Sequence, residues 1–154
     1  MKSSVVIMLC LWLNFEACRP KAPKPVERQQ QIVRYLQQVQ GVAEASQSSY
    51  AVVVFETGFC GACHRDFLAF IRQHINPAKH TYIVMQEYKQ EVADEFGSLP
   101  NVELLTDKNF ALEKYGLIYV KSTVFVVSEG NVIYWSFITD AKFNEIAGQL
   151  KSLS

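Results

Sequence analysis

The chain has 154 residues, of which 49% are hydrophobic and 12% aromatic. This composition predicts one compact domain with a hydrophobic core. Its 15 basic and 15 acidic residues cancel, which argues against nucleic acid or an anionic surface as the main partner.

The first residues have the pattern of an export signal. Lys2 supplies a positive start, and Val5–Leu13 is apolar apart from the thiol of Cys10. Nine such residues are too few to cross about 30 Å of hydrocarbon as a helix. We therefore expect residues 1–17 to be a signal peptide rather than a membrane span, and the mature protein to work outside the cytoplasm, in a bacterial periplasm.

Cleavage of this signal has two interpretations, and both concern Cys18. In the first, a lipoprotein-type signal is cut before Cys18, which then anchors the protein in the membrane through a lipid. Ala17 suits the position before such a cysteine, whereas Phe15 and Glu16 depart from the usual small apolar residues. In the second, an ordinary signal peptidase cuts nearby and leaves a free thiol. We favour lipidation, because an odd thiol beside an export signal otherwise has no use.

A tether and a helix follow the signal. Residues 18–25 contain three prolines, three cations and no core residue, so they predict a semi-rigid tether. The folded domain is expected over residues 26–154. It begins with an amphipathic helix over 26–46, whose apolar positions recur at helical spacing: Ile32, Leu36, Val39 and Ala43.

The most informative feature is the Cys-x-x-Cys pair formed by Cys60 and Cys63. It lies between the apolar run Ala51–Phe55, a predicted buried strand, and the amphipathic pattern Asp66–Ile75, a predicted helix. At a helix N-terminus, unpaired backbone N–H groups and the helix dipole stabilise a thiolate. The small residues Gly61–Ala62 allow the two sulfurs to close a disulfide. The pattern predicts thiol–disulfide exchange, with the exported dithiol either kept reduced by a partner or used as an oxidant.

The rest of the chain alternates helices with strands and closes with a hairpin. Strands are predicted at 81–85, 102–105, 123–127 and 132–135, and helices at 88–96, 110–115 and 140–150. Helices that alternate with strands before a final hairpin imply an α/β fold, with a central mixed sheet flanked by helices on both faces.

This order, with the dithiol after the first core strand, resembles the thioredoxin-like fold over roughly residues 50–150. The resemblance is carried by Val-Val-Val-Phe-Glu-Thr-Gly-Phe-Cys-Gly-Ala-Cys at 52–63 and by Tyr115-Gly116. The additional segment Glu87–Asp107 is similar to a TlpA/AhpC-like insertion, and an extra helix precedes the first strand. Both features are most similar to the TlpA and ResA type of exported, membrane-tethered thiol–disulfide oxidoreductase.

The resemblance implies roles for the residues of the dithiol. Cys60 corresponds to the attacking cysteine and Cys63 to the resolving one, so the two form the redox-active disulfide. Asp66 stands where TlpA and ResA type proteins carry a glutamate that is thought to relay protons. A first-turn acid stabilised by the helix dipole explains it equally well. Client proteins with thiols or disulfides and a membrane redox partner are implied, without a cofactor or a metal.

Three further residues are candidates for substrate binding. Phe59 takes the place of the family's usual tryptophan, and plain packing explains it equally well. Ser122, preceded by Lys121, stands where thioredoxin-fold oxidoreductases have a cis-proline. A cis bond before a residue other than proline costs about 2.5–4 kcal/mol, so this bond is expected to be trans. Val54 replaces the buried aspartate of thioredoxin itself, with Glu56 either substituting for it or simply exposed.

A binding function stays open beside thiol exchange. In the family the proline loop keeps metals off the sulfurs. With Ser122 in place of the proline, the protein could instead be a lipid-tethered carrier of a metal, an Fe–S cluster or haem. The run from Cys60 to His64 also spells the Cys-x-x-Cys-His haem-attachment motif, with His64 and Met85 as iron ligands. Against haem, a predicted strand leads directly into the motif and the other elements complete a thioredoxin-like order.

Overall fold

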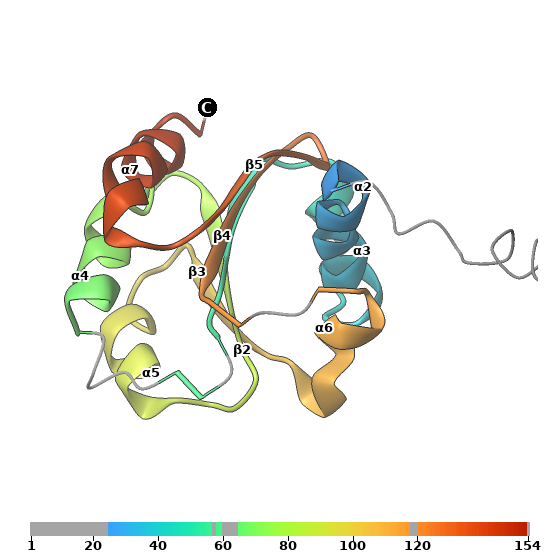
Figure 1. The fold of residues 1–154 in the computed structure, drawn as a ribbon, viewed down its shortest axis with the longest axis horizontal. Coiled ribbons are helices and arrows are strands. Elements are labelled where there is room, and N and C mark those ends of the chain that lie inside the picture. Colours follow the sequence, from blue (N-terminus) through green and yellow to red (C-terminus); the bar gives the residue numbers. More distant parts are fainter. Residues whose placement is uncertain (1–24, 57, 60–64, 118–119, 154) are drawn as a thin grey trace, which may run out of the picture.

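The structure, a computed structural model, describes residues 25–56, 58–59, 65–117 and 120–153. Within this part of the chain, a five-stranded mixed sheet separates two layers of helices (Figure 1). The predicted signal peptide at 1–17, the candidate lipidation site Cys18 and the tether up to residue 24 lie outside the described residues. In the described part, no helix has the length and apolar character needed to cross a membrane.

The sheet has the strand order β3-β2-β1-β4-β5. Its strands are β1 Tyr50–Val54, β2 His80–Met85, β3 Val102–Thr106, β4 Thr123–Ser128 and β5 Asn131–Phe137. β1, β2 and β3 are parallel, whereas β4 runs antiparallel to β1 and pairs with β5 in a hairpin. β1 takes the centre because all its residues are buried and most are valines, which suit a strand covered on both faces.

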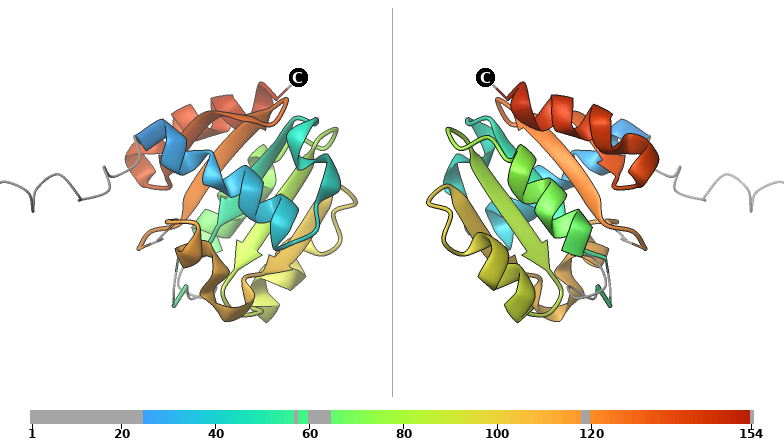
Figure 2. Two further views of the ribbon diagram at one scale, coloured as in Figure 1. Left: turned by 90° about the vertical axis from the view of Figure 1, so that its right-hand side faces the viewer. Right: turned by 90° about the vertical axis from the view of Figure 1, so that its left-hand side faces the viewer.

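Helices cover both faces of the sheet. α2 Pro25–Gln29, α3 Gln31–Gln38 and α6 Ala111–Lys114 lie on one face, and α4 Arg65–His74, α5 Gln90–Phe96 and α7 Phe143–Lys151 lie on the other (Figure 2). Short 3₁₀ turns are η1 Ala43–Ser46, η3 Lys108–Phe110 and η4 Asp140–Lys142. Because alternate strand residues point to opposite faces, Val52 and Val54 join the core with α3, whereas Ala51 and Val53 join the core with α4 and α7.

The predicted order of elements is confirmed, but the predicted N-terminal helix is not continuous. The segment predicted to be helical over 26–46 forms α2, α3 and η1. α3 ends at Gln38, and Gly41 then takes a φ of 74°, a left-handed conformation that turns the chain out of the helix. Val39 (39% exposed) and Ala43 are therefore exposed, and their predicted core positions are wrong. The helix instead buries Ile32, Val33, Tyr35 and Leu36.

The strand directions bring several chain segments to one edge of the sheet. β1 and β2 end there and β4 begins there, since Val54 pairs with Val84 on one side and Thr123 on the other. β3, which lies in the predicted insertion, ends at the same edge with Asp107 just beyond it. The connection from β1 to α4, which contains the predicted dithiol, therefore starts at the centre of this edge.

Candidate active site

The structure describes the residues on both sides of the predicted dithiol but not the dithiol itself. Cys60, Cys63 and His64 lie outside the described residues, between Phe59 and Arg65. The connection that carries them leads from the end of the central strand β1 to the start of α4. The pairing and the individual roles of the two cysteines therefore remain predictions, and the structure describes the chain on either side of them.

Phe59, the residue before Cys60, belongs to an aromatic cluster. Its side chain is 3% exposed, and its N–H donates to the Glu56 carbonyl (3.1 Å). Its ring stacks on Phe55 with centroids 4.3 Å apart and meets the Phe67 ring of α4 edge-on at 5.7 Å. Such ring pairs add to the stabilisation from apolar burial. The cluster thus ties together the two ends of the connection that carries the dithiol.

Asp66 begins α4 at the protein surface. It lies in the first helical turn, and both it and Arg65 are exposed. A carboxylate at this position interacts favourably with the positive end of the helix dipole. A role for Asp66 in moving the proton of Cys63 remains a prediction.

Ser122 links the end of β1 to the start of β4. Its side chain is 7% exposed, and its hydroxyl accepts the Glu56 N–H (3.3 Å) while its carbonyl accepts the Ile138 N–H (2.8 Å). Lys121 is exposed, and its carbonyl accepts the Thr123 hydroxyl (3.0 Å). The described chain contains no cis peptide bond, and the bond from Lys121 to Ser122 is part of it. Ser122 therefore holds the backbone that leads to the dithiol, whereas substrate binding by either residue remains a prediction.

A buried acid that the sequence analysis did not single out lies at the same edge. Asp107 is 3% exposed, and its N–H donates to the Met85 carbonyl (2.7 Å). Its carboxylate accepts the Tyr35 hydroxyl (3.0 Å) and the Leu112 N–H of α6 (3.2 Å to each oxygen). Gln40 donates to the Tyr35 hydroxyl (2.6 Å) and to the last carbonyl of β3 (3.1 Å). The network joins the N-terminal helices to the end of the sheet.

The environment of Asp107 affects its ionisation. Burial raises the pKa of the Asp107 carboxyl above its ordinary value, while the hydrogen bonds from Leu112 and Tyr35 lower it. Burial also raises the pKa of the Tyr35 hydroxyl. Aspartate side chains often accept hydrogen bonds from backbone N–H groups a few residues away, so the sequence contained a local signal for the bond from Leu112. The partner Tyr35 is 72 residues away and has no such signal.

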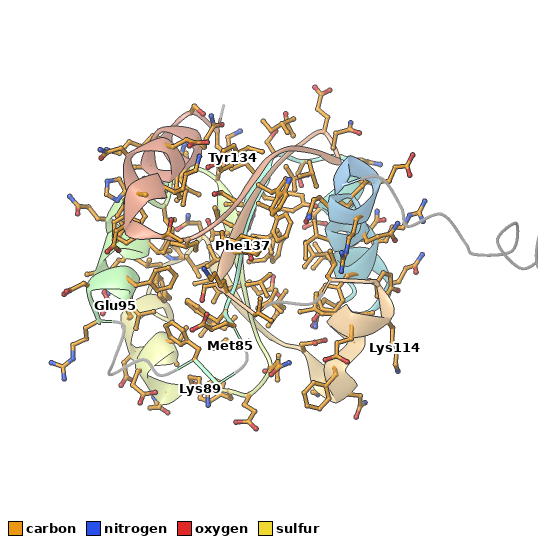
Figure 3. The ribbon with its side chains drawn as sticks, viewed as in Figure 1. Met85, Lys89, Glu95, Lys114, Tyr134 and Phe137 are labelled. Carbon is orange, nitrogen blue, oxygen red and sulfur yellow. The ribbon has the colours of Figure 1, made fainter. Side chains whose placement is uncertain are left out.

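A groove opens at this edge beside Phe59. It has a volume of about 260 Å³ and is lined by three segments: Phe55, Glu56, Gly58 and Phe59 after β1; Met85, Gln86, Glu87 and Lys89 around the end of β2; and Phe110 after β3. Figure 3 shows Met85 inside the fold and Lys89 at its lower edge. The Lys89 Nζ lies 3.3 Å from the Glu87 Oε2 at the rim. The groove can therefore receive an apolar side chain while charged groups stay at its mouth.

The described residues near the dithiol do not decide between thiol exchange and the haem or metal alternatives. Among the residues that the structure describes, no cluster of three or more histidine, cysteine or acidic side chains could hold a metal ion. Met85, the second haem ligand considered from the sequence, is buried in the core on the α5 side of the sheet. Cys60, Cys63 and His64, which either site would need, lie outside the described residues.

Known proteins resemble this chain in structure rather than in sequence. No family model and no curated protein matches the sequence. The crystal structure of a secreted Mycobacterium tuberculosis disulfide oxidoreductase homologous to E. coli DsbE has a TM-score of 0.52 at 13% identity, covering 72% of this chain and 86% of that chain. The chain has a thioredoxin-like fold. Xanthomonas campestris peroxiredoxin Q shares this fold with a TM-score of 0.50 at 14% identity, covering 72% of this chain and 82% of that chain. The predicted fold is confirmed, and identities this low leave the reaction to be argued from the site.

Proposed function

We propose that the protein is a thiol–disulfide oxidoreductase whose reactive groups are Cys60 and Cys63. The observation that carries the proposal is the position of the Cys-x-x-Cys motif in a thioredoxin-like fold, on the connection from the central strand β1 to α4. One structural neighbour is named a disulfide oxidoreductase and another a peroxiredoxin, and these names support cysteine redox chemistry for this chain.

The reaction needs two sulfurs and a client. The Cys60 thiolate attacks one sulfur of the client disulfide, an S–S bond forms between protein and client, and the other client sulfur leaves as a thiolate that takes up a proton. Cys63, deprotonated with help from Asp66, then attacks the Cys60 sulfur. The client's remaining sulfur leaves as a thiolate and the Cys60–Cys63 disulfide forms. Two electrons pass from the protein to the client, and the reverse sequence oxidises a client dithiol.

The proposed location is the extracytoplasmic side of a bacterial membrane. Cys18 would carry the lipid anchor, protein clients with thiols or disulfides would be the substrates, and a membrane redox partner would restore the dithiol. Mass analysis of the mature N-terminal peptide tests the anchor, because a lipid adds its mass to Cys18. A Cys18→Ser variant is expected to leave the membrane fraction. A mature N-terminus that begins beyond Cys18 would contradict the anchor and leave the exchange chemistry intact.

Trapping of client adducts tests the exchange reaction. Without the resolving sulfur, the mixed disulfide persists, so Cys63→Ala is expected to accumulate covalent adducts through Cys60. Cys60→Ala is the matched control, since it has the same number of cysteines. Adducts on Cys60→Ala at equal yield, seen on a non-reducing gel and located by mass spectrometry, would contradict the role assignment.

The reduction potential of the couple decides the direction of electron flow. A value near that of thioredoxin, about −270 mV, indicates a reductant of clients, and a value near about −120 mV indicates an oxidant. Titration against glutathione or dithiothreitol buffers measures it. A protein that shows no reversible two-electron titration would contradict the proposal.

A carrier of a metal, an Fe–S cluster or haem is the second candidate function. Ser122 favours it, because this residue stands where the related oxidoreductases have the proline that keeps metals off the sulfurs. Protein purified anaerobically from its natural host would then contain bound metal or show the Soret band of haem. Colourless, metal-free protein that titrates reversibly would exclude this function.

A further inference from the structure

The groove beside Phe59 combines an apolar interior with an exposed aromatic side chain at its mouth. Phe55, Phe59 and Met85 are buried and form the inner surface, whereas Phe110 on the outer side is 55% exposed. An exposed phenylalanine at the mouth of an apolar groove leaves apolar surface in water unless another group covers its ring.

The backbone of Phe110 is held in a conformation that a bulky residue rarely adopts. Its φ of 52° and ψ of 42° are left-handed, and the preceding Asn109 is also left-handed with a φ of 61°. Conformations of this kind cost free energy and persist where the surrounding structure enforces them, often at functional sites.

Asp107 enforces this conformation. Its N–H bonds to the Met85 carbonyl on one side of the turn, and its carboxylate accepts the Leu112 N–H on the other side. The Tyr35 hydroxyl holds the same carboxylate from α3. With both ends of the turn fixed, Phe110 stays at the groove instead of following the regular helical path predicted for residues 110–115.

One residue that lines the groove is the sequence neighbour of the proposed reactive cysteine. Phe59 lines it and precedes Cys60 directly, and consecutive Cα atoms are about 3.8 Å apart. The Cα atoms joined by a disulfide are about 4.4–6.8 Å apart, so a client bonded to Cys60 must place the residues beside its own cysteine within roughly 10 Å of the Cys60 Cα. An extended client advances about 3.3 Å per residue, so a side chain one or two residues from its cysteine reaches the groove.

We propose that the groove is a specificity site for a client segment that carries an aromatic or long aliphatic side chain beside its reactive cysteine. In this proposal, which rests on the exchange function above, Phe110 determines specificity and Asp107 positions it. The client side chain packs on the inner surface of the groove and covers the exposed ring of Phe110, which removes apolar surface from water. Ser, Gly or charged residues at the same client position leave the groove empty and do not gain the stabilisation that comes from burying apolar surface.

Two matched peptides test the proposal. Both carry one cysteine as a mixed disulfide with thionitrobenzoate, and they differ only in having Phe or Ser beside that cysteine. Attack of the reduced Cys60 on the peptide sulfur forms the protein–peptide disulfide and releases coloured thionitrobenzoate, and Cys63 then expels the peptide thiol. The rate constant for each peptide is measured with the full chain, after subtracting the background of Cys60→Ala, which reports the other thiols.

The wild-type protein is expected to react about tenfold faster with the Phe peptide, the discrimination that one apolar side chain gives in a partly open site. Phe110→Ala should reduce the ratio of the two rates to within about twofold, and Phe110→Leu should retain most of the preference. Because unfolded chains react with both peptides alike, circular dichroism first checks that each variant is folded to the same extent as wild type. Ile133→Ala is the control, since Ile133 is 61% exposed on β5, away from the groove lining, and its rates and ratio should match wild type.

Equal rates for the two peptides with wild-type protein, or an unchanged ratio in Phe110→Ala, would overturn the specificity site while the exchange function stands. No release above the Cys60→Ala background with either peptide would overturn both. A concentration-dependent dimer that Phe110→Ala abolishes would show that a second copy occupies the groove, and would also overturn the proposal.

Discussion

Replacing Tyr35 by phenylalanine measures how much the buried network around Asp107 stabilises the fold. The substitution keeps the ring, which packs edge-on against Tyr115 at 6.0 Å, and removes only the hydroxyl. Two hydrogen bonds are lost, the one donated to the Asp107 carboxylate (3.0 Å) and the one accepted from Gln40 (2.6 Å). Gln40 keeps its hydrogen bond to the Thr106 carbonyl, so most of the loss in stability comes from the Asp107 carboxylate, which loses a donor.

The expected magnitude follows from the charge and burial of Asp107. A hydrogen bond to a charged group contributes about 1.5–3 kcal/mol, and Asp107 still keeps the Leu112 N–H. We therefore expect Tyr35→Phe to lower the free energy of unfolding by about 2 kcal/mol near neutral pH. The Tyr35 hydrogen bond lowers the pKa of Asp107, so its loss raises that pKa further above the ordinary 3.8. The destabilisation should consequently shrink as the pH falls and Asp107 becomes protonated in the folded state.

Urea unfolding followed by tryptophan fluorescence measures this loss, with the same series repeated at acidic pH. Tyr115→Phe is the matched control, because its hydroxyl donates to the exposed Gln38 Oε1 (2.9 Å) and its loss should change stability by less than about 0.5 kcal/mol. A Tyr35→Phe effect equal to that of Tyr115→Phe, or one that does not change with pH, would refute the reasoning.

Asp107→Asn and two glycine substitutions test other parts of the fold. The raised pKa means that the folded state binds the Asp107 proton more tightly than the unfolded state does. Wild-type stability should therefore fall as the pH rises from 3.8 through the pKa of Asp107 in the folded state. The slope of this fall is at most about 1.4 kcal/mol per pH unit. Asp107→Asn should remove this decline in urea unfolding, and an unchanged slope would assign the titration to another group. Gly130→Ala should lower stability by more than about 2 kcal/mol, since Gly130 has a φ of 74° and a Cβ there would collide with the Ser46 carbonyl oxygen. Gly148→Ala in α7, where a Cβ meets nothing within 4 Å, should instead raise stability by about 0.5–1 kcal/mol. Thermal melts in which Gly130→Ala and Gly148→Ala shift the melting temperature in the same direction would contradict these two predictions.

The order of helices and strands could be predicted because its signals are local. The valine-rich run of β1 is buried at every position, and the apolar spacing of α4 and α7 matches their covered faces. These patterns depend only on the repeat of each element, 2 residues in a strand and about 3.6 in a helix, and therefore appear in the sequence itself. The same holds for the Cys-x-x-Cys motif, whose place between a strand and a helix follows from its neighbours along the chain.

The end of the first helix was harder to predict because its apolar spacing continues past its real end. Val39 and Ala43 maintain the helical repeat in the sequence, yet Gly41 turns the chain and exposes both. Periodicity records which side of a helix is apolar, and it does not record whether the helix is still present.

The amino-acid sequence by itself determined the class of fold and the two sulfurs that the proposed chemistry uses, since both are encoded within short stretches of chain. Only the tertiary structure decided that Tyr35 donates a hydrogen bond to Asp107, 72 residues away, and that Phe59, Met85 and Phe110 line one groove. The physical reason is that these contacts join a helix to the end of a strand and the ends of different strands to one another. Which strand ends meet depends on the order and direction of pairing across the whole sheet, and no single segment contains that information.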